Sequence, residues 1–113
     1  MDGLNIKAKN EEEILNPKNL MLIIQKEIEN EKIKLKEFVK KIYYDCMKKI
    51  KEAINVGSTD IFYKVPSENS EYKNYNSINC LKYIEKKLRK NNFKTFIDEN
   101  ENMIFVTWKY LFS

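Results

Sequence analysis

The feature that most constrains this chain is a long series of regularly spaced apolar residues in its N-terminal half. These residues recur mostly three, four or seven positions apart, the spacing of one face of an amphipathic helix. They are Leu20, Ile24, Ile28, Leu35, Val39, Ile42, Cys46, Ile50 and Ala53. Asn16 and Pro17 suit a helix start, and Gly57 suits the position just past a helix end. The pattern predicts an amphipathic helix over residues 17–56.

Such a helix is long for the chain that carries it. About 40 residues rise roughly 60 Å at ~1.5 Å per residue, whereas a compact domain of 113 residues has a radius of gyration of roughly 13 Å. The apolar stripe therefore extends past what the rest of the chain can cover. Either the polar stretch 29–32 divides the segment into a helix pair that folds back, or the projecting part packs against a partner chain.

The remainder, residues 57–113, predicts a β-α-β-β unit. A short strand over residues 60–66 ends at Pro66, and Ser77 can cap a second helix that ends at residues 91–92. Two further strands, 93–98 and 103–110, flank the polar turn 99–102 and form a hairpin. We therefore expect an α+β fold with a small, mainly antiparallel three-stranded sheet and a winged-helix-like element order. We also expect residues 17–113 to form a single domain, preceded by a polar tail or arm over residues 1–16.

The last predicted strand is apolar on both faces. Its residues alternate between two sets, Ile104, Val106, Trp108 and Tyr110 on one side and Met103, Phe105 and Leu111 on the other. Strands of this kind are typical of sheets that are covered on both sides. One short helix cannot cover both faces of the sheet. We expect the long helix to cover the second face, with a partner chain as the alternative.

Residues for catalysis are scarce. The chain contains no histidine and only two glycines, which removes the commonest general base and metal ligand and leaves no phosphate-binding glycine loop. Asp98, Glu99 and Glu101 could hold Mg²⁺, but a solvated turn explains them equally well. Cys46 and Cys80 do not form a CxxC pair, so we expect reduced core cysteines, with a mutual disulfide as the alternative. We expect no enzymatic activity, no cofactor, no metal and no small-molecule substrate.

Positive charge gathers on two segments of a chain whose formal net charge is +4. One is the long helix, and the other is the second helix, whose polar face carries Lys82, Lys86, Lys87, Arg89 and Lys90. A basic helix followed by a hairpin is similar to a winged-helix module. If it binds nucleic acid, these residues make phosphate contacts with strong salt dependence. A solvated face is the plainer interpretation.

Short stretches from Tyr63 to Trp108 resemble a family of short proteins encoded by large cytoplasmic DNA viruses of eukaryotes. The resembling residues are 63–66, Tyr75, Cys80, 83–84, 88–93 and 104–108. Asn92 stands where that family has Gly, and Asn can also adopt the left-handed conformation. The resemblance implies a viral origin, in host cytoplasm or virion, and brings no catalytic residues. The N-terminus also lacks the basic-then-apolar order of a secretion signal.

The leading hypothesis is a non-enzymatic viral structural or interaction protein, a minor virion or assembly component that acts through a protein partner or self-association. The residues expected to make these contacts are Leu20, Ile24, Ile28, Leu35, Trp108, Tyr110 and Phe112. The alternative is a small basic winged-helix-like protein that binds nucleic acid through the second helix. No apolar run approaches the ~20 residues of a transmembrane helix, so we expect no membrane span.

Overall fold

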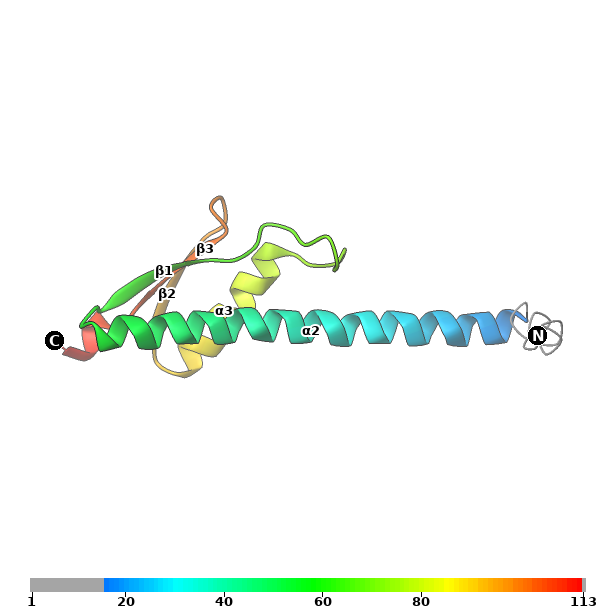
Figure 1. Cartoon of the computed structure of the whole chain (residues 1–113), viewed down its shortest axis with the longest axis horizontal. Coiled ribbons are helices and arrows are strands. Elements are labelled where there is room, and N and C mark those ends of the chain that lie inside the picture. The colour runs from blue at the N-terminus through cyan, green and yellow to red at the C-terminus, as the bar shows by residue number, and fades with distance from the viewer. Residues whose placement is uncertain (1–15, 113) are drawn as a thin grey trace. The chain divides into compact units, whose positions relative to one another are not determined.

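The computed structural model describes residues 16–112, so the predicted tail over residues 1–16 lies, except for Asn16, outside the described residues. The elements follow in the order α2 (Pro17–Asn55), β1 (Asp60–Lys64), α3 (Ser77–Lys90), β2 (Lys94–Asp98), β3 (Met103–Thr107) and the short 3₁₀ helix η1 (Lys109–Phe112) (Figure 1). This order confirms the predicted α+β fold, in which a long helix precedes a β-α-β-β unit.

Helix α2 is helical from Pro17 to Asn55, and the polar residues 29–32 do not interrupt it. Asn16 caps its start, because the Asn16 side-chain oxygen accepts a hydrogen bond from the Lys18 amide at 2.9 Å. Its end is closed by Gly57, whose φ of 82° lets the Ser58 amide reach back to the Ala53 carbonyl at 2.9 Å. Both ends therefore use the cap residues that the sequence predicts.

The described residues divide into two units, 16–34 and 35–112, and the boundary between them falls within α2. Each unit is described by itself below. The second unit contains the last turns of α2, the whole β-α-β-β segment and η1.

The sheet has the strand order β1-β3-β2, and both pairs of neighbours are antiparallel. Phe105 in the central strand lies opposite Phe62 in β1 and opposite Phe96 in β2. Helix α3 passes into β2 through Asn92, which has a φ of 70°. Asn92 thus adopts the left-handed conformation that Gly would otherwise supply.

The hydrophobic core lies on one face of the sheet and is shared by α2, α3 and the strands. Its most buried members are Cys46, Ile50, Cys80, Leu81, Ile84, Leu88, Ile104 and Val106. On the α2 side, the Tyr63 hydroxyl of β1 donates a 2.7 Å hydrogen bond to Asp45. On the α3 side, Arg89 Nε donates to the buried Thr95 hydroxyl of β2 at 3.0 Å. Both helices are thus joined to the same face, which we call the inner face.

The expectation that the long helix covers the second sheet face is wrong. The buried stripe of α2 joins that of α3 on the inner face, because a domain this small gathers its helices around one core. The opposite face, which we call the outer face, keeps Phe62 67% exposed and Phe96 63% exposed. Within residues 16–112, therefore, the outer face is left without a cover.

Candidate interaction surfaces

The first surface is the apolar side of α2 in the first unit. Every residue from 21 to 34 is exposed, although this segment is rich in large apolar side chains. Met21 is 60% exposed, Ile24 52% and Ile28 50%. We call these three residues the exposed stripe. Large apolar side chains gathered on one side of a helix mark a surface that another chain can bury.

The exposed stripe follows a seven-residue repeat. Met21, Ile28, Leu35 and Ile42 occupy one repeated position, which corresponds to position a of a coiled coil, while Ile24, Glu31 and Phe38 occupy position d. In the second unit these positions face the core: Ile42 is buried, and Leu35 and Phe38 pack against it. In the first unit the same positions are exposed. The sequence pattern is therefore continuous, but its burial begins only at Leu35.

The second surface is the outer face of the sheet. Phe62, Phe105 and Phe96 lie side by side across the three strands, with ring centroids 4.8 Å apart for Phe62 and Phe105 and 6.2 Å apart for Phe105 and Phe96. We call this set the phenylalanine row. Its rings contact one another rather than a covering element, so the row presents a continuous aromatic strip.

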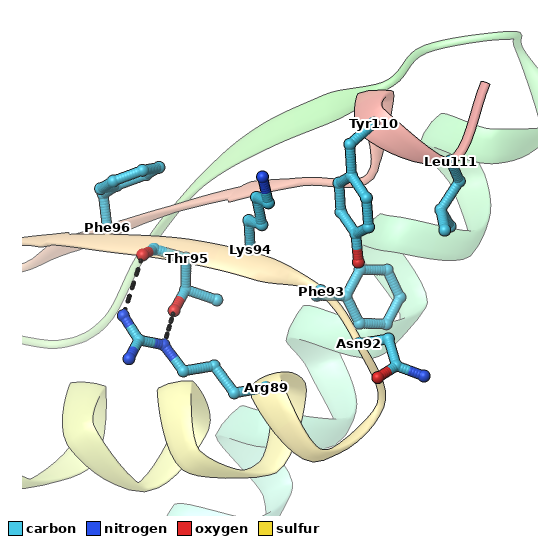
Figure 2. Close-up of a pocket in the computed structure, with 8 residues that line it drawn as sticks. All are labelled: Arg89, Asn92, Phe93, Lys94, Thr95, Phe96, Tyr110 and Leu111. Atoms are coloured by element: carbon cyan, nitrogen blue, oxygen red, sulfur yellow. Dashed lines mark hydrogen bonds between the residues drawn. The ribbon is translucent and has the colours of Figure 1, made fainter. Parts of the chain in front are cut away.

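A hollow of about 530 Å³ lies beside the phenylalanine row, where β2 meets η1. Figure 2 shows Thr95 directed from β2 toward Arg89 of α3, while Lys94 and Phe96 point to the other side of the strand. The Lys94 ammonium lies 4.8 Å from the centre of the Tyr110 ring, close enough for a cation–π contact. Tyr110 therefore borders the outer face at Lys94.

The third surface is the basic face of α3. All five predicted phosphate-contact residues are exposed there, at positions 82, 86, 87, 89 and 90. Arg89, however, is held within the chain: it pairs with Glu85 at 3.3 Å and donates to the Thr95 carbonyl at 3.3 Å. The Lys87 ammonium lies 5.6 Å from the centre of the Tyr83 ring. Lys82, Lys86 and Lys90 follow one another at intervals of one helical turn and form the line best placed to meet a phosphate backbone.

A smaller groove of about 300 Å³ lies between α2 and α3 in the second unit, lined by Leu35, Val39 and Tyr83 and by Lys36 and Lys40. The surface that these residues present to the groove is almost wholly apolar. The groove lies at the first residues of α2 that contact the core.

The reactive groups of the core are kept neutral. Cys46 and Cys80 are free and buried, which confirms the prediction of reduced core cysteines. Burial, and then the nearby Asp45 charge, raises the pKa of the Cys46 thiol to about 12. Burial also raises the pKa of Cys80, Tyr63 and Tyr75. These side chains therefore remain protonated near neutral pH, and the two thiols are poor nucleophiles.

Within the part of the chain that the structure describes, no cluster of three acidic, cysteine or histidine side chains is placed to hold a metal ion. No helix among these residues is both long and apolar enough to cross a bilayer.

Residues 21–89, from the exposed stripe to the last turn of α3, match a known protein family, described as a family of unknown function (DUF5759). The chain belongs to this family. No curated protein and no solved structure matches the chain. The matched region begins at Met21 of the exposed stripe and stops before β2 and β3, so it contains the first surface and the basic helix but only one strand of the sheet.

The residues predicted to make protein contacts do not lie on one surface. Ile24 and Ile28 are exposed, whereas Leu20 is half-buried and Leu35 packs against the core. The prediction that Trp108 offers a contact face is wrong: it is only 2% exposed and meets the Phe93 ring edge-on at 6.0 Å. Trp108 lies in the core because it continues the alternation of Ile104 and Val106, which point toward the inner face. Tyr110 is half-buried beside Lys94, and the Phe112 side chain lies outside what the structure describes.

Phe62 and Phe96 are surface residues that were not predicted from the sequence. The sequence contains a pattern that could have identified them. Each is the middle residue of a five-residue strand, and the residues on either side of it point inward. Period-two alternation places Phe62 with Asp60 and Lys64, and Phe96 with Lys94 and Asp98, on one face. Charged neighbours of this kind mark the exposed side of a strand.

Proposed function

We propose that the chain is a non-enzymatic structural protein that assembles through protein–protein contacts, and that the exposed stripe of α2 pairs with the same stripe of a second copy. The observation that carries the proposal is the change of burial along one repeat: Ile42 is buried, whereas Met21 and Ile28 at the same heptad position are exposed. A helical stripe that is apolar but unburied is stabilised when a second helix covers it.

The charges beside the exposed stripe favour a parallel pair of helices. Glu27 occupies position g and Lys32 position e of the next heptad. In a parallel two-stranded coiled coil these two positions face each other across the interface, so Glu27 of each copy meets the partner's Lys32. The pair forms twice by symmetry. Glu31, which stands at position d, opposes the pairing, because each copy would bring a carboxylate into the seam.

The length of the exposed stripe indicates a weak contact. Only about two heptads are exposed before α2 enters the core of the second unit at Leu35, and short isolated coiled coils gain little from so few buried residues. A weak helix pair supports a protein that assembles reversibly or through more than one contact.

The test measures the mass of the full chain by sedimentation velocity over a range of concentrations. Wild type is expected to sediment as a dimer or larger species at high concentration, and Ile28→Asp to abolish the helix pairing. Leu22→Asp is the matched control, because Leu22 is 56% exposed but lies on the other side of the helix. Equal loss of association in both variants, or no association in wild type, contradicts the proposal.

A second variant tests the register of the pair. Glu31→Leu replaces the polar d position with a side chain that contributes about 1.5–3 kcal/mol when fully buried, so association should strengthen by about tenfold or more. Unchanged association shows that the stripe does not pair at heptad positions a and d.

The viral part of the proposal is supported by the resemblance of the segment from Tyr63 to Trp108 to proteins of large cytoplasmic DNA viruses. A structural role in such a virus places the chain in the virion or in host cytoplasm during assembly. Mass spectrometry of purified particles should find its peptides at a constant ratio to the major capsid protein. Their absence from particles and from assembly sites removes this part of the proposal.

Nucleic-acid binding through α3 is a second candidate function. The line of exposed lysines 82, 86 and 90 supports it, together with an element order similar to that of a winged helix. Lys82→Glu and Lys86→Glu should then weaken binding to a fluorescent duplex. Each substitution should also reduce the slope of log affinity against log salt by about one, because it removes one lysine from the phosphate backbone. Lys48→Glu, on α2, is the control. Binding that is absent, or equally affected by Lys48→Glu, contradicts this candidate.

A further inference from the structure

The outer face of the sheet carries a pattern of charge as well as the phenylalanine row. Each of its three strands contributes three outward residues: Asp60, Phe62 and Lys64 from β1, Thr107, Phe105 and Met103 from β3, and Lys94, Phe96 and Asp98 from β2. The register places these residues in a grid of three rows. The middle row is wholly aromatic, and each edge strand brings one acid and one lysine.

The four charges stand at the corners of this grid with alternating sign. Asp60 and Lys94 both lie opposite Thr107, so they share one end of the face. Lys64 and Asp98 both lie opposite Met103 and share the other end. Neighbouring corners therefore differ in sign along the strands and across them, and the corner charges sum to zero.

We propose that the outer face is a second self-association surface, on which two copies of the chain pack sheet against sheet about a two-fold axis. Sheets that pack face to face lie about 10 Å apart with their strands roughly aligned. An axis along β3 sets Phe62 against the partner's Phe96 and Phe105 against its own copy. The same axis sets Asp60 against the partner's Lys94 and Lys64 against the partner's Asp98.

Because the corner charges alternate in sign, the face is also complementary to itself when the two-fold axis runs across the strands instead of along β3. A two-fold axis across the strands sets Asp60 against the partner's Lys64 and Lys94 against the partner's Asp98. In either case all four corners of one copy meet opposite charges of the other, while the aromatic rows bury each other. A two-fold interface uses the same patch on both copies, and this patch satisfies that condition.

Charge also favours a second copy over a nucleic acid as the occupant. Aromatic rows on an open sheet can stack on bases, but such sites combine the rings with a positively charged groove that follows the phosphates. The corners of the outer face carry two acids and two lysines, so the face offers phosphates no net attraction. A protein face with the same alternating charges is its better complement.

The contacts that the corner lysines make within the chain are easily exchanged. Lys64 lies 3.7 Å from Glu101, but both side chains are more than half exposed, and an ion pair of this kind contributes little stability. Lys94 lies over the Tyr110 ring at the border of the face. Both lysines can turn toward the partner's carboxylates without disturbing the core.

The sheet pairing differs in surface from the helix pairing proposed above and does not depend on it. If both form, each copy has two different two-fold interfaces, and copies joined alternately through them build an assembly larger than a dimer. That consequence rests on the proposed function. Such an assembly suits a structural protein, because weak contacts are strengthened when many copies are linked.

The test uses sedimentation velocity of the full chain in an Ile28→Asp background, which removes the helix pairing. This variant is expected to remain dimeric through the sheet. Adding Phe96→Ser should make it monomeric, whereas adding Val56→Ser, at a residue that is 79% exposed in the loop after α2, should not. Circular dichroism checks that each variant is folded. A monomeric Ile28→Asp variant at every concentration overturns the sheet pairing and leaves the helix pairing intact.

Charge swaps provide a test that does not remove an aromatic ring. Asp60→Lys alone should weaken the dimer about fivefold or more, a loss of about 1 kcal/mol. With the axis along β3, adding Lys94→Asp should restore it. With the axis across the strands, adding Lys64→Asp should restore it instead. If neither double variant recovers the association that Asp60→Lys loses, or if Asp60→Lys loses none, the proposal is overturned.

Discussion

Raising the pH above about 9 should destabilise the second unit, and the buried thiol of Cys46 supplies a separately measurable part of the loss. Cys46 lies on the buried side of α2 in the hydrophobic core, and burial raises the pKa of its thiol from the ordinary 9.0 to about 12, with the Asp45 charge as the second cause. An unfolded chain releases this proton near pH 9, whereas the folded chain keeps it until the pH approaches 12. Between these values the unfolded state is favoured as the pH rises.

The magnitude follows from the difference between the two pKa values. Each pH unit above 9 lowers the free energy of unfolding by about 1.4 kcal/mol, until the folded thiol itself ionises. At about pH 10.5 the loss due to Cys46 alone should be about 2 kcal/mol. Below pH 9 the thiol is protonated in both states, so it contributes no pH dependence there.

Urea unfolding, followed by circular dichroism under reducing conditions, measures this loss in wild type and in Cys46→Ala. The variant loses some packing at every pH, so the informative quantity is the difference in unfolding free energy between the two proteins. That difference should shrink by about 2 kcal/mol between pH 8 and about pH 10.5. The raised pKa values of Tyr75 and Cys80 act in both proteins and cancel, and so does the part of the Tyr63 shift that burial and Asp45 cause. An unchanged difference would refute the argument.

Two further changes test the local structure of the second unit. Tyr63→Phe removes the 2.7 Å hydrogen bond to Asp45, so thermal unfolding should show that the free energy of unfolding falls by about 1 kcal/mol. Tyr44→Phe, at an exposed tyrosine, is the control. Equal losses in the two variants would show that the hydrogen bond to Asp45 adds no stability. Asn92→Ala should lower the free energy of unfolding by about 1–2 kcal/mol, because Asn92 has a φ of 70° that alanine adopts at a cost. Asn92→Gly should lower it by nothing. Equal stability of the two variants would show that the positive φ does not determine which residue is favoured here.

Elements and core positions followed closely from local patterns. Gly57, which has no Cβ, and Asn92 take positive φ values that these residue types tolerate. Leu81, Ile84 and Leu88 of α3 are buried at positions that helical spacing selects. These features depend on neighbours within a few residues along the chain. The exposed stripe was also foreseen, because the length of α2 exceeds what one small core can cover.

The candidate surfaces on the sheet did not follow from the sequence. The alternation of residues correctly predicts that the last strand is apolar on both faces. It does not show which face is covered, and Trp108, predicted to lie on a contact surface, is buried beside Phe93. Phe62 and Phe96 were not assigned to any site. Their common row exists only because the register places both opposite Phe105, and strand pairing brings together residues that are far apart along the chain.

By itself, the sequence determined which side of each helix and strand is apolar, because that property depends only on the direction of side chains along one backbone. Which apolar sides are covered was decided by the tertiary structure. Ile42 and Ile28 occupy the same heptad position, yet only Ile42 has a core to pack against. Burial depends on which elements the folded chain brings together, and the local spacing of apolar residues does not indicate which elements those are.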